Sequence, residues 1–194
     1  MKRTGEMANE KLMVIGLFKN RDDAECAYAM LAQHGYGNDE TDVMMSSETR
    51  DRYYSASSKD ETASGTQALE GTGVGGAVGG AVGATIGMIA AIGTSIALPG
   101  LGLVIAGPLA AALVGAGAGG LTGGLIGALI GSGIPEDRAA AYESGIQSGG
   151  IVLRTHPRTS EEASLIESNW RECGGEYVYS SARTDASAAG ASRL

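Results

Sequence analysis

The sequence predicts an α+β protein whose two ends build one domain around a long apolar insertion. Three observations support this prediction. No charged residue occurs between Glu70 and Glu136, so the net charge of −8 lies wholly in the flanks. Glycine recurs at every fourth position in two parts of the uncharged segment. Each flank alternates short apolar runs with capped, amphipathic segments, which is the pattern of strands and helices.

The N-terminal flank predicts a strand, a helix and a second strand. Residues 11–18 form a short apolar run that ends in turn residues, as strands do. Asn20 is the expected N-cap of a helix that runs to about Gln33, with acidic residues in its first turn. Residues 41–46 alternate apolar and polar side chains and form the second expected strand.

The C-terminal flank predicts a helix, a strand, a helix and a strand. The first helix begins near Pro135, and residues 151–155 form the strand that follows it. Thr159 caps the second helix, which should turn Leu165, Ile166 and Trp170 inward. Residues 177–179 form the last strand.

Neither flank has enough strands to bury a sheet face alone, so we expect both flanks to share one sheet. The order of elements predicts a split ferredoxin-like sandwich, with four antiparallel strands and two helices on one face. The predicted organisation is a flexible tail at 1–10, the split domain at 11–47 and 134–182, a linker at 48–70, a glycine-zipper helical hairpin at 71–133 and a second flexible tail at 183–194.

The first strand suggests that the other face of the sheet is covered too. If alternate residues face the two helices, then Met13, Ile15 and Leu17 lie on the side that a two-layer sandwich leaves to solvent. Apolar side chains there predict a cover, either another subunit or the base of the hairpin. Ordinary surface apolarity is the alternative.

The glycine ladders predict two closely packed helices, at 72–93 and 108–131, joined by an apolar turn at 97–103. Nine ladder glycines would cost on the order of 9 kcal/mol relative to alanine, so contact between helix backbones must offset them. Small residues on more than one side of each helix invite a second copy of the chain. The expected helix-packing and oligomerisation residues are Gly75, Gly79, Gly83, Gly87, Gly115, Gly119, Gly123, Gly127 and Gly131, and Gly107 extends the second ladder in phase.

Each expected helix is long enough to cross a bilayer, which takes about 20 residues. We therefore expect the hairpin to insert in lipid and the ferredoxin-like domain to lie in the cytoplasm. The alternative is a cytoplasmic soluble assembly whose hairpins pack in a shared protein core. The sequence gives neither the oligomer number nor the membrane sidedness.

Several stretches resemble the bacterial general stress proteins, also described as heat-induced stress proteins. The resemblance rests on the strand Val14–Phe18, the helix that begins at Arg21, the glycine-zipper middle and the Gly-Ile-Pro-Glu…Tyr-Glu…Gly-Gly-Ile-Val-Leu stretch at 133–153. It covers roughly residues 12–180. The resemblance implies a stress-response context and supports the fold, but it implies no catalytic residues.

The inventory of reactive residues predicts no catalytic, cofactor-binding or metal site. His34 lies at the end of the first helix, where capping is the expected role. Together with Cys26, His156 and Cys173 it lacks the spacing of zinc ligands. Two cysteines and no apolar N-terminal segment suggest a reducing compartment with free thiols, a single disulfide being the less favoured alternative. The acidic flanks argue against nucleic-acid binding.

The predicted function is that of a non-enzymatic, stress-associated protein that is membrane-anchored and self-assembles through the hairpin. Two alternatives remain open. One is a soluble self-assembling structural protein. The other is a module that senses a small ligand, whose identity the sequence does not give.

Overall fold

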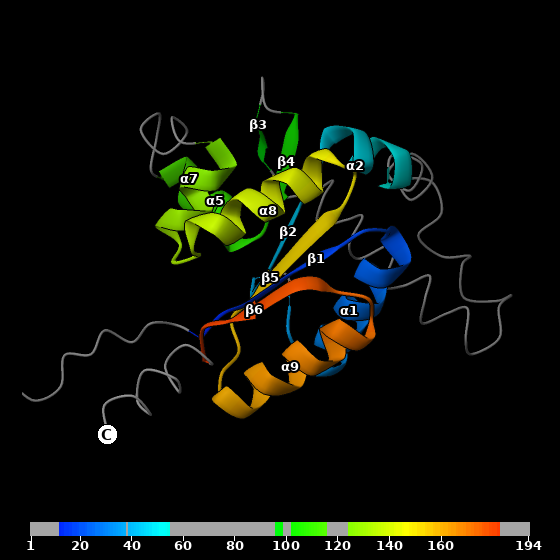
Figure 1. The fold of residues 1–194 in the computed structure, drawn as a ribbon, viewed down its shortest axis with the longest axis vertical. Helices are drawn as coiled ribbons and strands as arrows, with labels where there is room; N and C mark the ends of the chain where they lie inside the picture. The colour runs from blue at the N-terminus through cyan, green and yellow to red at the C-terminus, as the bar shows by residue number, and fades with distance from the viewer. Residues whose placement is uncertain (1–11, 38, 55–95, 99–101, 116–123, 183–194) are drawn as a thin grey trace, which may run out of the picture.

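The computed structural model describes residues 12–37, 39–54, 96–98, 102–115 and 124–182, and shows an α+β fold with helices on both faces of one antiparallel sheet (Figure 1). Six strands stand in the order β3-β4-β2-β5-β1-β6. The strands are β1 (Val14–Phe18), β2 (Thr41–Ser46), β3 (Ile96–Leu98), β4 (Leu103–Ala106), β5 (Ile151–Thr155) and β6 (Glu176–Ser180). The helices are α1 (Arg21–Gln33), α2 (Ser47–Tyr54), α5 (Pro108–Gly115), α7 (Gly124–Gly131), α8 (Glu136–Gln147) and α9 (Ser160–Glu172).

The centre of the sheet is made by strands from opposite ends of the chain. β1 pairs with β5 in antiparallel register, with Leu17 opposite Val152. β5 also pairs with β2, and β6 pairs with the other side of β1. The first strand of the N-terminal flank therefore pairs with both strands of the C-terminal flank. The flanks thus share one sheet, in the order β2-β5-β1-β6.

One face of the sheet packs against α1 and α9 (Figure 1). Its centre contains the edge-to-face pair of Phe18 and Trp170, whose ring centroids are 5.7 Å apart. Ile166 is buried as expected, whereas Leu165 is 43% exposed and does not face inward. The N-caps that the sequence predicts for these helices are confirmed, since Asn20 and Thr159 each accept a backbone hydrogen bond from the third residue beyond.

The opposite face packs against α5, α7 and α8 (Figure 1). Met13, Ile15 and Leu17 are buried there, and Leu125 and Leu129 of α7 pack in the same cluster. The prediction that this face is covered is confirmed, and the cover includes residues of the inserted segment. The protein therefore has two cores, one on each side of the sheet.

The predicted helix at 108–131 is wrong as a single helix. α5 ends at Gly115 and α7 begins at Gly124, whose φ of 60° lies in the left-handed region that an α-helix cannot run through. The first predicted helix, 72–93, lies outside the described residues. Among the residues that the structure does describe, no helix combines the length and apolarity needed to span a membrane.

The chain reverses direction within the predicted turn at 97–103, but the turn is shorter than expected, because strands occupy both of its ends. β3 and β4 form a hairpin, and β4 pairs with β2 in antiparallel register. Leu103–Ala106 is fully buried. The physical reason is that β2 would otherwise have unpaired backbone groups at an open edge, beside an apolar face of the sheet. An aliphatic strand pairs with those backbone groups and adds apolar side chains to that face.

The predicted linker at 48–70 begins with a helix, α2, rather than with irregular chain. The hydroxyl of Ser46 accepts a hydrogen bond from Thr49 N at 3.0 Å, and Thr49 Oγ1 donates to Gly149 O at 3.2 Å. The second of these bonds attaches α2 to the loop before β5. The rest of the linker and both predicted tails lie outside the described residues.

Gly107 does not serve as a ladder residue. It joins β4 to α5 with a φ of 104°, and an added Cβ would overlap Thr41 O on the backbone of β2. We expect Gly107→Ala to lower the free energy of unfolding by at least about 2 kcal/mol, because it adds a backbone overlap to a strained conformation. Chemical denaturation would measure this.

Gly102→Ala is the matched control for this prediction. Gly102 also has a positive φ, 61°, but a Cβ there would meet nothing within 4 Å. The free energy of unfolding of Gly102→Ala should fall only by the cost of the backbone conformation, about 1 kcal/mol. Equal losses at the two positions would show that the approach of Gly107 to β2 is not needed.

Candidate functional site

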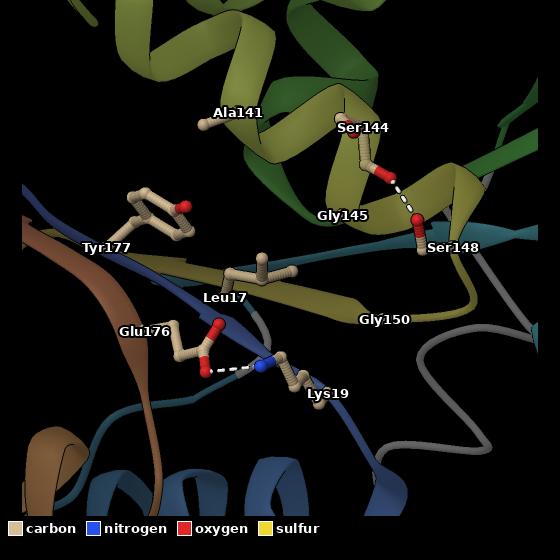
Figure 2. Close-up of a pocket in the computed structure, with 9 residues that line it drawn as sticks. All are labelled: Leu17, Lys19, Ala141, Ser144, Gly145, Ser148, Gly150, Glu176 and Tyr177. Atoms are coloured by element: carbon tan, nitrogen blue, oxygen red, sulfur yellow. Dashed lines mark hydrogen bonds and ion pairs between the residues drawn. The ribbon is translucent and has the colours of Figure 1, made fainter.

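A cavity of about 310 Å³ lies between the C-terminal half of α8 and the edge formed by β1 and β6 (Figure 2). Figure 2 shows α8 on one side of it, and Leu17, Tyr177 and the ion pair of Lys19 with Glu176 on the other. The lining residues are Leu17, Lys19, Ala141, Ser144, Gly145, Ser148, Gly150, Glu176 and Tyr177. Cavities that hold small ligands start at about this size.

The floor of the cavity is apolar and depends on two glycines. An added Cβ at Gly145 would overlap the side chain of Leu17, and one at Gly150 would lie 2.9 Å from Leu17 Cδ1. Leu17 itself is only 4% exposed, because it belongs to the core beneath α8. The missing side chains let the end of α8 approach β1 and leave the hollow above Leu17 open.

Tyr177 reaches the cavity through a distortion of the edge strand. Ile15 pairs with Tyr179 but Leu17 pairs with Glu176, so β6 has one residue more than β1 between these pairs, a β-bulge. Among the described residues, Tyr177 is the non-glycine residue with a positive φ, 51°, a conformation that costs about 1–3 kcal/mol. The residue as a whole is 57% exposed.

A buried tyrosine on α8 holds this bulge in place. The hydroxyl of Tyr142 donates a 2.7 Å hydrogen bond to Tyr177 O. Tyr142 is fully buried, and burial raises the pKa of its phenol well above the ordinary value, so it stays protonated and able to donate. Strained residues and bulges are enriched at functional sites, and this one presents an aromatic ring to a cavity.

The electrostatics of the cavity favour positive charge. Lys19 Nζ lies 2.6 Å from Glu176 Oε1, and the two side chains are 70% and 40% exposed. The hydrogen bond and the charge of Glu176 raise the pKa of Lys19 above its usual value. The last turn of α8 carries no basic residue, so the partial negative charge of its C-terminal end is uncompensated by its own sequence. Lys19 is the only cation among the lining residues.

The glycines predicted to pack helices fall outside this cavity. Gly127 and Gly131 lie on α7, where an added Cβ would meet nothing within 4 Å. Gly115 ends α5. The other six, Gly75, Gly79, Gly83, Gly87, Gly119 and Gly123, lie outside the described residues. The first predicted ladder lies wholly outside the described residues, so contact between the two ladders stays a prediction.

Cys26 and Cys173 form a disulfide, with Cα atoms 5.8 Å apart, between α1 and the residue that follows α9. The expectation of two free thiols is therefore wrong. The two cysteines are 147 residues apart in sequence, so only the tertiary fold places them together. His34 is the C-cap of α1, as expected, with Nδ1 2.9 Å from Met30 O. Within the described ranges, no group of three or more His, Cys, Asp or Glu side chains could hold a metal ion.

Fold and site together define an α+β protein with helices on both faces of its sheet and a small-ligand-sized cavity at one edge. Comparison with models of protein families, with curated proteins and with solved structures found no match.

Proposed function

We propose that the chain is a non-enzymatic, stress-associated protein that self-assembles through its glycine-rich segment. In this proposal the segment is mounted on one face of a split ferredoxin-like domain. The strand order β2-β5-β1-β6, with α1 and α9 packed on the same face, supports that classification. The resemblance of residues 12–180 to general stress proteins supports the stress context.

The observation that carries the proposal is the composition of α7. Every residue of this helix, Gly-Leu-Ile-Gly-Ala-Leu-Ile-Gly, is apolar. Leu125 and Leu129 are fully buried against the sheet, whereas Ile130 is 42% exposed. A helix that is apolar on all sides is expected to be buried on all sides. The described residues cover one side of α7, and we propose that a second copy of the chain covers the other.

The packing of α5 and α7 favours a protein core over a bilayer for this half of the segment. Leu109 and Ala110 of α5, like Leu125 of α7, are buried in the cluster above the sheet. We therefore propose that assembly takes place outside lipid and that any membrane anchoring rests on residues 72–93. A carbonate wash of the membrane fraction tests this point, because a lipid-embedded chain stays in the pellet and a protein assembly is released.

We expect Gly127→Leu to reduce the mass of the assembly, measured by light scattering after size-exclusion chromatography. A leucine fits the described fold, because the space at Gly127 is open, but it would hold a partner helix away and forfeit its dispersion contacts. In the free chain the substitution should instead favour the helix by up to about 1 kcal/mol. The two effects have opposite signs, so assembly and stability can be read separately.

Two controls accompany this variant. Gly127→Ala adds little bulk and should keep the parent mass. Ser168→Leu adds a leucine on the exposed surface of α9, away from α7, and should also keep it. A parent chain that is monomeric, or a Gly127→Leu chain with the parent mass, would contradict the proposal. Deleting 71–133 is a poorer test, since it removes β4 and α7 from the fold.

A further inference from the structure

We propose that the cavity between α8 and the β1–β6 edge binds a small organic ammonium ion, with Glu176 as its counter-ion and the ring of Tyr177 against its body. This site is separate from α7 and does not depend on self-assembly. The ligand's ammonium would replace that of Lys19 on the carboxylate of Glu176.

The charge of the ligand follows from what surrounds the cavity. A carboxylate and the C-terminal end of α8 both attract a cation, and the last turn of α8 has no basic residue to neutralise it. An aromatic face, such as that of Tyr177, also attracts cations. The net charge of the chain, −8, favours the approach of a cation from solution. Lys19 is the single lining feature that favours an anion.

Lys19 occupies the anionic end of the cavity without being fixed there. Its side chain is 70% exposed, and its ion pair with Glu176 is a surface pair. Such pairs contribute little to stability, so a ligand's ammonium can take the place of the lysine at small cost. The ion pair of Lys19 with Glu176 thus has the same chemistry, an ammonium against a carboxylate, as the contact that we propose for the ligand.

The floor and the volume of the cavity indicate the size and polarity of the rest of the ligand. Leu17, Ala141, Gly145 and Gly150 offer an apolar surface, which suits a short aliphatic chain. The hydroxyls of Ser144 and Ser148 lie on the α8 side, within the same lining. A volume of about 310 Å³ is at the lower end for ligand sites, which suits an alkylammonium ion better than a nucleotide-sized molecule.

The bulge explains why an aromatic residue is held in a costly conformation at this place. Regular pairing would continue the alternation of β6, whereas the extra residue redirects Tyr177, and Tyr142 fixes the redirected backbone. A structural role alone would be served better by glycine, which adopts a positive φ freely. The aromatic ring, and not the backbone conformation, therefore accounts for a tyrosine at this position.

Saturation-transfer difference NMR on the full chain, at constant ionic strength, tests the proposal with n-butylammonium chloride. Sodium butyrate and n-butanol are the matched anionic and neutral probes. We expect saturable binding of butylammonium alone. Glu176→Gln should weaken it about tenfold, since it removes a charge-assisted hydrogen bond. Tyr177→Gly should weaken it about threefold without harming the fold, because the glycine relieves the strained backbone.

The direction in which Lys19→Met changes the affinity for butylammonium is the decisive result. If Lys19 competes with the ligand, its removal should tighten butylammonium binding about threefold. Glu172→Gln, which removes an exposed charge at the end of α9, controls for net charge and should leave binding unchanged. Binding of butyrate in place of butylammonium, weaker binding in Lys19→Met, or equal binding in Glu176→Gln would each overturn the proposal. So would the absence of saturable butylammonium binding.

Discussion

Asp42→Ala is expected to lower the free energy of unfolding by about 3–5 kcal/mol, because it leaves a buried guanidinium without its counter-ion. Asp42 and Arg154 are cross-strand partners on β2 and β5, and both are buried. Asp42 Oδ2 accepts a hydrogen bond from Arg154 Nε at 2.7 Å, and Arg154 Nη2 lies 2.7 Å from the same oxygen as its ion-pair partner. The pair lies on the face that α5, α7 and α8 cover.

The second carboxylate oxygen of Asp42 ties the inserted segment to the sheet. Oδ1 accepts a hydrogen bond from Leu109 N at 2.6 Å, in the first turn of α5. Asp42 therefore acts as an N-terminal cap supplied by another element, and such a cap contributes about 1 kcal/mol. The loss in Asp42→Ala should include the detachment of α5 from β2.

Denaturant unfolding followed by the fluorescence of Trp170, the one tryptophan, would measure this effect. Asp42→Leu combined with Arg154→Met is the informative control. It removes both charges together, so it should recover most of the loss. A loss below about 1 kcal/mol in Asp42→Ala, or a double variant no better than the single one, would contradict a buried ion pair at this position.

The flanks could be predicted from sequence because their signals are local. Asn20 accepts a 2.9 Å bond from Asp23 N, and Thr159 accepts one of 3.1 Å from Glu162 N, so each helix start is set within four residues. Alternation along residues 13–18 predicted both faces of β1 and the cover over the second one. In each case neighbouring side chains decide the outcome.

The insertion and the cavity could not be predicted in this way, because tertiary contacts decide them. The aliphatic run at 103–106 suits a helix or a strand equally, and the open edge of β2 selects the strand. No residue near Tyr177 in the sequence predicts the bulge. The bulge depends on the hydroxyl of Tyr142, 35 residues away. The redirected tyrosine and the hollow above Leu17 appear only when α8 lies over the sheet.

Reducing the Cys26–Cys173 disulfide is expected to lower the free energy of unfolding by about 5 kcal/mol, because the bond closes a very long loop in the unfolded chain. The sequence separation is 147 residues, and the loop includes the whole glycine-rich segment. Cys26 is exposed and Cys173 is half-buried, so a phosphine reductant can reach the bond. Denaturant unfolding with and without reductant would measure the difference.

Serine variants separate the bond from the residues that form it. Cys26→Ser and Cys173→Ser should each match the reduced parent, and the double variant should lose little more, because either change breaks the same bond. An unfolding midpoint that reductant leaves unchanged would mean that the thiols are free in solution. The bond joins α1 to the end of α9, on the face of the sheet opposite α7. Reduction should therefore weaken the fold while leaving the mass of the assembly as it was, whereas Gly127→Leu should do the reverse.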